Sequence, residues 1–218
     1  MEAGHLSDIV PVTIPGSDLV VSQDNGIRLA SLDKLAKLKP AFRKGGTITA
    51  ANSSFLSDGA SACLLTTEQR AKQLELKSKA VLKHYCYASQ DPKEELLLGP
   101  VYAIPKLLKS TGMKLADFDV IELHEAFAGQ VLCNLKAMSS EKFCTEKLGW
   151  SEAVGEVDES KMNLWGGSVS LGHPFGATGI RLLNHAANRL EKEDGQLALV
   201  AACAANAQGV AMIVERAK

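Results

Sequence analysis

A histidine within a glycine-rich run and a cysteine at the end of an apolar run have the clearest chemical potential in this sequence. His173 lies in the run 166–179, and Cys203 follows the apolar residues 197–202. An imidazole accepts a proton near neutral pH, and a thiol acts as a nucleophile or as a general acid and base. The flanking glycines let a substrate approach the backbone closely. Together these features predict acyl-transfer chemistry on thioesters.

Each candidate also has a purely structural interpretation. His173 precedes a predicted helix whose positive end favours a neutral ring, but a turn histidine fits the same pattern. Cys203 also fits a small buried hydrophobic residue. His124 and Glu125 close an apolar strand, where ligand crevices form in α/β sheets, although Glu125 equally suits the first turn of a helix.

Composition narrows the function classes. The chain has 218 residues, 46% of them hydrophobic and 22% charged, which is typical of a soluble globular protein with one large or two small domains. The net charge of −1 and the scattered basic residues give little support for binding nucleic acid or an anionic membrane. The longest apolar run is too short for a transmembrane segment, and no metal-site motif occurs.

The cysteines and the N-terminal residues give information on the cellular compartment of the protein. The five cysteines are odd in number and form no CxxC pair, which predicts buried free thiols in a reducing compartment. Residues 1–5 resemble neither a signal peptide nor an arginine-rich transit peptide.

The first third of the chain differs from the rest. Residues 1–45 carry turn signals and a short helix after Ser31, and we expect this stretch to lie over another part of the molecule. Residues 47–50 and 60–65 are predicted strands. We place a domain boundary between residues 65 and 66, so that 1–65 and 66–218 form the two units.

From residue 66 the pattern alternates between helix and strand. Thr66 and Gln69 predict a capping box, and Gly112 predicts a helix end. After Gly179, a stripe of Ile180, Leu183, Ala187 and Leu190 predicts an amphipathic helix. The predicted strands are 80–88, 119–123, 197–203 and 210–215, and the predicted helices before Gly179 are 66–76, 100–111 and 126–138. We expect an α/β fold, a βαβαββ unit with a mixed five-stranded sheet covered by helices.

Several segments, taken together, resemble the thiolases. Residues 124–128 resemble that family's Asn-Glu-Ala-Phe-Ala segment, and residues 163–179 resemble its Gly-His-Pro-x-Gly-Ala-Thr-Gly signature. Residues 202–205, followed by Gly209, resemble its C-terminal active-site cysteine loop, and residues 47–59 resemble the end of its first half. These matches occur in the family's order and cover nearly the whole chain.

Within the family, His124 in place of asparagine and residues 89–92, 96–100 and 168–175 resemble the long-chain 3-ketoacyl-CoA thiolases of mitochondrial fatty-acid β-oxidation. The resemblance implies acyl-CoA and CoA as substrates and no metal or redox cofactor. It also implies a mitochondrial location, a homodimer, and an α subunit with hydratase and dehydrogenase activities as partner.

The resemblance also implies residue roles. His173 would take the proton from a nucleophilic cysteine, which becomes acylated as 3-ketoacyl-CoA is cleaved. Cys203 would protonate the departing acetyl-CoA enolate, and His124 would bind the thioester oxygen as an oxyanion-hole donor. The backbone N–H of Ala205 would contribute to a second oxyanion hole. Ser54 would contact the pantetheine arm, which Gly172 would let approach.

Departures from the family pattern limit these implications. In thiolases the acylated cysteine belongs to the first half, and none of the other four cysteines lies in a segment that resembles its motif. We therefore expect a C-terminal portion that is inactive alone. Asn206 and Ala207 replace glycines, and their Cβ atoms restrict positive φ near the second oxyanion hole. Ala51 and Phe55 replace smaller residues around Ser54.

Two other function classes also fit parts of the sequence. One is a non-catalytic module that dimerises or binds a partner through a bare apolar face. The other is a condensing enzyme of the ketoacyl-synthase type, whose Cys-His-His site His124 and His173 imitate. Cys203 argues against the second class, because those enzymes lack this second thiol.

Overall fold

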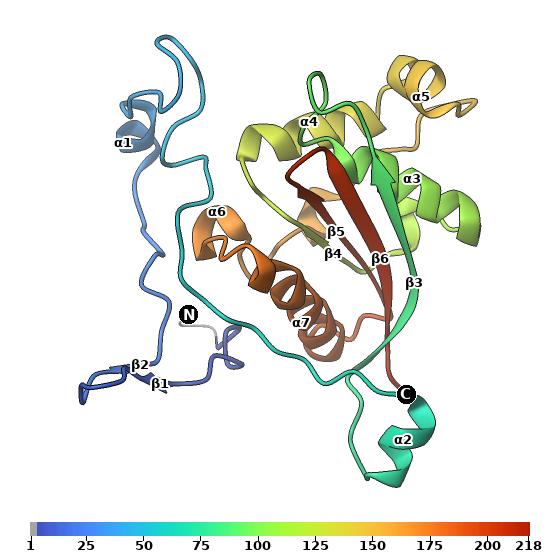
Figure 1. Cartoon of the computed structure of the whole chain (residues 1–218). Coiled ribbons are helices and arrows are strands. Elements are labelled where there is room, and N and C mark those ends of the chain that lie inside the picture. Colours follow the sequence, from blue (N-terminus) through green and yellow to red (C-terminus); the bar gives the residue numbers. More distant parts are fainter. Residues whose placement is uncertain (1–3) are drawn as a thin grey trace.

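The computed structural model describes residues 4–218, so the first three residues of the N-terminal stretch considered above lie outside it. Two regions differ in character (Figure 1). Residues 4–79, here called the arm, form a long and mostly irregular segment. Residues 80–218, here called the body, form a sheet with helices packed against it, and the arm runs along α6 and α7 of the body (Figure 1).

The sheet of the body is mixed. Its strands are β3 (Ala80–Ser89), β4 (Val120–Leu123), β5 (Leu197–Ala204) and β6 (Gln208–Arg216), in the spatial order β3-β6-β5-β4. β4 pairs with β5 in parallel, whereas β6 is antiparallel to both β5 and β3. This arrangement confirms the α/β class, the βαβαββ order and the terminal hairpin.

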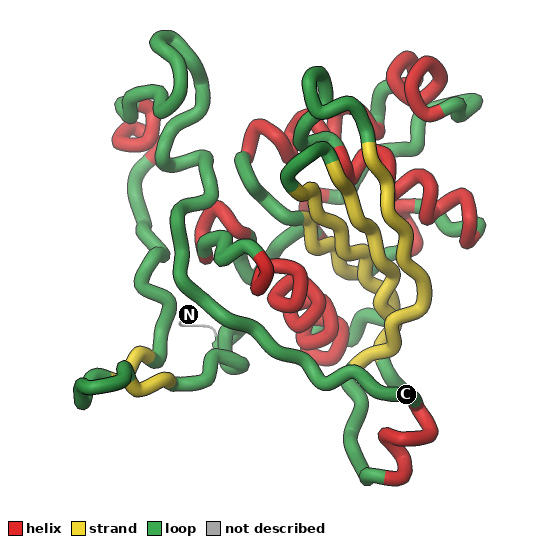
Figure 2. The backbone as a smooth tube through the Cα atoms, viewed as in Figure 1, coloured by secondary structure: helices red, strands yellow, loops and turns green. Residues whose placement is uncertain are grey.

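The predicted fifth strand is absent from this sheet, which has four strands among residues 4–218. Segments 47–50 and 60–65 form no ladder, and Figure 2 shows both as loop. The β4 edge of the sheet is already occupied, because Met162 forms a bridge with Ile121. Strand β3 leaves the other edge of the sheet free, but neither segment pairs with it, because Ser53, Ser57 and Ser61 hold the intervening chain against Phe127, His173 and Ala177.

The body contains the three predicted helices in their predicted order and two short helices that were not predicted. They are α3 (Gly99–Thr111), α4 (Ala128–Met138), α5 (Glu141–Leu148), α6 (Ser168–Leu171) and α7 (Gly176–Lys192), with short 3₁₀ turns η1 (Leu115–Asp117) and η2 (Glu159–Lys161). Gly112 ends α3 with φ of +71°, as predicted from its position. Helix α7 begins at Gly176, and one continuous helix of 17 residues leads away from His173.

Two apolar cores lie on opposite faces of the sheet. The core beneath α3 includes Ile104, Leu107, Phe118, Ile121 and Leu199. The core beneath α7 is smaller and includes Val120, Leu182, Ala186, Leu190 and Val200. The sheet is thereby held between helices, and its β4 and β5 ends are fixed from both sides.

The stripe predicted for α7 is partly wrong. Leu190 is fully buried and Leu183 packs against the same core, as predicted, but the other fully buried apolar residues are Leu182 and Ala186, whereas Ile180 and Ala187 are only half-buried. The helix also buries the polar His185 and Arg189 against Glu122 of β4. The buried arc is therefore rotated toward polar residues that an apolar pattern does not reveal.

The arm has almost no core of its own. It contains β1 (Val12–Thr13), β2 (Val20–Val21), α1 (Leu32–Ala36) and α2 (Glu68–Gln73), and Ala71 is its only buried residue among those described. The capping box predicted at Thr66 is wrong: Thr67 caps α2 by accepting a hydrogen bond from the Arg70 backbone N–H, 3.2 Å away. The threonine next in sequence has the extended backbone that an N-cap needs.

Free thiols are confirmed for all five cysteines, but the prediction that they are buried holds only in part. Cys144 and Cys203 are buried, Cys86 is half-buried, and Cys63 and Cys133 are exposed. Within residues 4–218, no helix is long and apolar enough to cross a bilayer. The same part of the chain holds no group of three or more side chains placed to bind a metal ion.

Candidate active site

His124 lies where β4 ends, at the carboxyl edge of the sheet. Its backbone N–H donates to the carbonyl of Ala201 on β5, 2.9 Å away. The side-chain amide of Asn163 bonds both the N–H and the C=O of Leu123 at 2.9 Å and so continues the ladder on the outer side of β4. The strand end is thus fixed on both sides, and the imidazole that follows it has a defined position.

The His124 side chain is buried, with 2% of its surface exposed. Its Nδ1 lies 2.9 Å from the hydroxyl of Ser168, which also accepts a hydrogen bond of 2.8 Å from Arg181 Nη2. Its ring lies against the His173 ring, with centroids 4.1 Å apart. Burial, His173 and Arg181 lower the pKa of His124 to about 3, so the ring is neutral at physiological pH.

His173 is held by residues from the arm and from α7. Its backbone N–H donates to the Ser57 hydroxyl, 3.1 Å away, and its Nδ1 lies 2.7 Å from the Thr178 hydroxyl. The preceding Gly172 has φ of +98°, and a Cβ there would lie 2.1 Å from Ser57 Oγ. Glycine is therefore required at position 172 both for its backbone conformation and for the approach of the arm.

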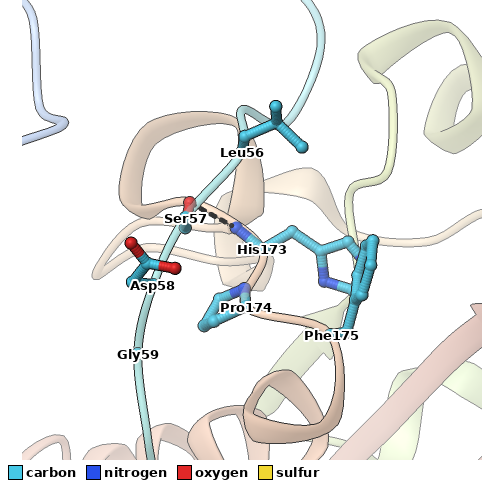
Figure 3. Close-up of a pocket in the computed structure, with 7 residues that line it drawn as sticks. All are labelled: Leu56, Ser57, Asp58, Gly59, His173, Pro174 and Phe175. Carbon is cyan, nitrogen blue, oxygen red and sulfur yellow. Dashed lines mark hydrogen bonds between the residues drawn. The ribbon is translucent and has the colours of Figure 1, made fainter.

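A hollow of about 460 Å³ opens beside His173 (Figure 3). It is lined by Leu56, Ser57, Asp58, Gly59, His173, Pro174 and Phe175, and Figure 3 shows arm and body residues facing each other across it. Burial and the charge of Arg181 lower the pKa of His173. The neutral ring expected from the sequence thus has burial and Arg181 as its causes.

Glu125 fastens the glycine-rich run to the end of β4. Its carboxylate accepts hydrogen bonds from Asn163 Nδ2 at 2.6 Å and from the Val169 backbone N–H at 3.0 Å. A Cβ at Gly167 would lie 2.2 Å from this carboxylate, so the glycine makes room for it. Glu125 therefore positions the segment that carries Ser168 and His173.

Cys203 lies near the end of β5, beside the turn into β6. It is buried, with 6% of its surface exposed, and burial raises its pKa to about 11. The thiol is therefore protonated at neutral pH. Within residues 4–218, no hydrogen bond joins it to either histidine, and the close pair of the site is His124 with His173.

In the loop after Cys203, two residues with a Cβ atom adopt the positive φ that such residues disfavour. Ala205 is exposed and starts the turn, and Asn206 and Ala207 have φ of +64° and +57°. L-residues pay a steric cost in this region, which asparagine tolerates better than alanine. The hairpin packs on the start of α3, where a Cβ at Gly209 would lie 2.2 Å from the carbonyl oxygen of Gly99.

Ser54 lies beside the site without lining the hollow. Its backbone N–H donates to the carbonyl of Ala126, 3.0 Å away, and Ser53 forms an isolated bridge with Phe127. This pairing attaches the arm to the segment between β4 and α4. Ser57, three residues later, is the serine that reaches His173.

Four residues that contact the two histidines directly, or through Ser168 in the case of Arg181, were not singled out from the sequence. They are Ser57, Ser168, Thr178 and Arg181. Thr178 lies in the same motif as His173, so its position five residues later was a usable signal. Arg181 lies on α7 one residue after the predicted stripe begins, and only its burial beside Ser168 distinguishes it from a surface arginine.

Comparison with known proteins gives matches along nearly the whole chain. The family model for the thiolase C-terminal domain matches residues 76–216, and the model for the thiolase N-terminal domain matches residues 1–69. The rat mitochondrial trifunctional enzyme subunit beta is 60% identical over 215 residues, covering 98% of this chain and 45% of the rat protein. A probable 3-ketoacyl-CoA thiolase of Caenorhabditis elegans is 55% identical over 214 residues, covering 97% of this chain and 48% of that protein.

A solved structure is similar as well. Human mitochondrial 3-ketoacyl-CoA thiolase in complex with CoA superposes with a TM-score of 0.82 at 31% identity, over 99% of this chain and 50% of that chain. The chain thus spans about half the length of the relatives that it matches. With both family models matched along it, the chain belongs to the thiolase family.

Proposed function

We propose that this chain supplies the C-terminal part of the active site of a 3-ketoacyl-CoA thiolase, an acetyl-CoA C-acyltransferase of fatty-acid β-oxidation. The observation that carries the proposal is the pair of neutral histidine rings with centroids 4.1 Å apart, one of which borders an open hollow. The names of the rat and nematode relatives support the same reaction class.

In this proposal His173 is the base of the nucleophilic step. It accepts the proton of a cysteine thiol, the resulting thiolate attacks the 3-keto carbon, and the bond between the α- and β-carbons breaks. To accept at Nε2, His173 must carry its own hydrogen on Nδ1 and donate it to Thr178, 2.7 Å away. Its lowered pKa supports this role, because a protonated ring has no free lone pair.

Cys203 acts as the acid that completes the cleavage. The departing acetyl-CoA carries the bonding electron pair as an enolate, and the Cys203 thiol gives its proton to the α-carbon. A pKa of about 11 keeps this thiol protonated at neutral pH, as an acid requires. The Cys203 thiolate then takes the proton of the CoA thiol, whose sulfur attacks the acylated cysteine. The bond from the acyl group to that cysteine breaks, the cysteine sulfur takes back the proton held by His173, and the shortened acyl-CoA leaves.

The remaining groups bind the substrate. His124 donates to the thioester oxygen, and the Ala205 N–H donates to the oxygen of the acylated cysteine. Gly172 leaves space for the pantetheine chain of CoA, and Ser54 contacts that chain. The left-handed backbone at Asn206 and Ala207 carries a steric cost that glycines at these positions would avoid, so the second oxyanion hole is the weaker of the two.

The chain by itself is proposed to be inactive, because the thiol to be acylated is missing from the hollow. None of the residues lining it is a cysteine. Cys63 and Cys133 are exposed, Cys86 lies on β3, and Cys144 is buried in α5. We expect no CoA-dependent cleavage of acetoacetyl-CoA by the pure chain, and a rate above that of buffer would refute this part of the proposal.

Binding of a substrate analogue tests the site independently of turnover. A CoA thioether analogue of acetoacetyl-CoA, added to the pure chain, should shift the ring C–H signals of His124 and His173 in NMR spectra. Substitutions His124→Ala and His173→Ala should weaken binding, whereas His84→Ala on the exposed surface of β3 is the matched control. Histidine signals that stay unchanged at saturating analogue would overturn the proposal.

The relatives' names also suggest the setting. The rat protein is named as a subunit of a mitochondrial trifunctional enzyme, so we propose a mitochondrial location and a partner subunit with hydratase and dehydrogenase activities. A homodimer is the assembly that we propose for the thiolase part. Crosslinking followed by mass spectrometry in mitochondria would test both partners.

A second candidate function is a non-catalytic interaction module. Strand β3 lies at the edge of the sheet and exposes Val81, Leu82, Tyr85 and Tyr87. An edge strand with exposed apolar side chains is a surface for pairing with another chain. Light scattering after size exclusion distinguishes this function, since a clean monomer at high concentration would count against it.

A further inference from the structure

Arg181 and Ser168 form a buried connection to His124 that the proposed roles above do not use. The Ser168 side chain is fully buried, and its hydroxyl has two polar neighbours: Arg181 Nη2 at 2.8 Å and His124 Nδ1 at 2.9 Å. Arg181 comes from α7, Ser168 from α6 and His124 from the end of β4. Three separate elements thus meet at one hydroxyl oxygen.

The chemistry of the three groups fixes the direction of each hydrogen bond. A guanidinium has only donors, so Ser168 must accept from Arg181. The hydroxyl still has one hydrogen of its own, and among residues 4–218 the only recorded acceptor for it is His124 Nδ1. If Nδ1 carried the histidine proton instead, Ser168 would accept twice and bury its hydrogen without a partner, which is costly in a protein interior.

We propose that Arg181 and Ser168 are positioning residues that fix His124 as the neutral tautomer with its proton on Nε2. The ring then has one free donor, Nε2–H, and no free acceptor. This is the form that an oxyanion-hole donor needs, and the inference deepens the proposed function and rests on it for its catalytic meaning. The tautomer itself follows from the hydrogen-bond geometry alone.

Charge adds a second constraint on the same ring. The titratable groups that bear on His124 are His173, whose ring lies against it, and Arg181, and neither favours a second proton. Arg181 carries a fixed positive charge, and together with burial it keeps His124 neutral. Arg181 therefore orients the proton of His124 through Ser168 and adds to the burial that keeps the ring from becoming a cation.

The arrangement also distinguishes the two histidines, although their rings touch. His124 is fixed as a donor through Ser168. His173 Nδ1 contacts the Thr178 hydroxyl, and in the recorded hydrogen bonds of residues 4–218 no arginine donates to that hydroxyl. Thr178 can therefore accept a hydrogen from Nδ1, and this tautomer leaves Nε2 of His173 as an acceptor. Two adjacent imidazoles of opposite hydrogen-bonding character are what a donor and a base require.

The test is ¹⁵N NMR of the chain labelled on histidine, with the His124 signals identified by their loss in His124→Asn. We expect wild-type His124 to show a protonated Nε2 and an unprotonated, hydrogen-bonded Nδ1 from pH 8 down to pH 5. A proton on Nδ1, or a doubly protonated ring in this range, would overturn the proposal without any variant.

Variants separate positioning from mere packing. Ser168→Ala should move the Nδ1 signal toward that of a nitrogen without a hydrogen bond, and Arg181→Met should populate both tautomers and raise the pH at which His124 titrates. Arg181→Lys keeps a cationic donor and should retain the wild-type tautomer. Unchanged signals in both Ser168→Ala and Arg181→Met would overturn the proposal.

Matched controls lie nearby. Ser170 is on the same short helix and donates only to the Gly167 carbonyl, 3.1 Å away, so Ser170→Ala should leave the His124 signals unchanged. Arg216 pairs with the exposed Asp194, and Arg216→Met controls for the loss of an arginine. Failure of the CoA analogue to bind would overturn the proposed function and leave the measured tautomer standing. The opposite tautomer would overturn only this inference.

Discussion

The arm and the body contribute to the same hollow but are stabilised in different ways. The body buries two apolar cores, one on each face of its sheet. The arm buries a single residue among those described and is attached through polar contacts, such as the hydrogen bond of 2.6 Å from Ser61 to the Ala177 carbonyl. Such contacts break individually at low cost, so the arm can open while the body stays folded. The hollow beside His173 therefore has one rigid wall and one wall of low local stability.

Truncation of apolar side chains should give the largest difference between the two regions. Leu107 is 1% exposed in the body, and Leu107→Ala should lower the free energy of unfolding by about 2–5 kcal/mol. Leu29 is 99% exposed in the arm, and Leu29→Ala should change it by less than about 0.5 kcal/mol. Urea unfolding measures both values. Equal losses would show that the arm shares the core of the body.

Lowering the pH should reduce the free energy of unfolding of the body more than the stability of the arm, because the buried histidines belong to the body. The pKa of His124 falls from 6.5 to about 3 on folding, so its contribution to stability is complete above pH 6.5 and is lost as the pH falls toward 3. Between pH 7 and pH 5 this loss is about 2 kcal/mol, because the unfolded state binds the proton first.

Replacing His124 isolates this contribution. In His124→Asn, the decrease in unfolding free energy between pH 7 and pH 5 should be smaller than in the wild type by about 2 kcal/mol. The exposed His84→Asn on β3 controls for the loss of an imidazole. Urea titrations at the two pH values give the slopes, and identical slopes in His124→Asn and wild type would contradict a neutral buried His124.

Removal of one contact between arm and body should have the smallest effect. Ser57→Ala removes the acceptor for the His173 N–H and should weaken docking of the arm by about 1 kcal/mol, without a comparable change in global unfolding. Limited proteolysis of the arm should then be roughly fivefold faster. Ser17→Ala, which loses only a local bond to the Leu19 N–H, is the control. A cleavage rate unchanged in Ser57→Ala would show that this contact does not hold the arm.

Much of the fold followed from local patterns. Gly112 ends α3, and the apolar runs before His124 and Cys203 are strands, because these signals act within a few residues. The prediction of a fifth strand was wrong because segments 47–50 and 60–65 have apolar residues but pair with neither edge of the sheet, and pairing is not a local property. The α7 stripe was misplaced because Arg189 and His185 are buried against Glu122, which a pattern of apolar residues cannot indicate.

The sequence by itself determined which groups are present and in which order: two histidines, a thiol after a strand, and glycines around His173. It also placed the chain in its family, because the motifs are short and contiguous. Only the tertiary structure decided which of these groups meet and what surrounds them. His124 contacts Ser168, 44 positions away, and His173, 49 positions away, and Arg181 reaches Ser168 from a different helix. Burial among such neighbours lowers the pKa of both histidines. Proton positions and pKa values depend on neighbours in space, and the chain must fold before those neighbours exist.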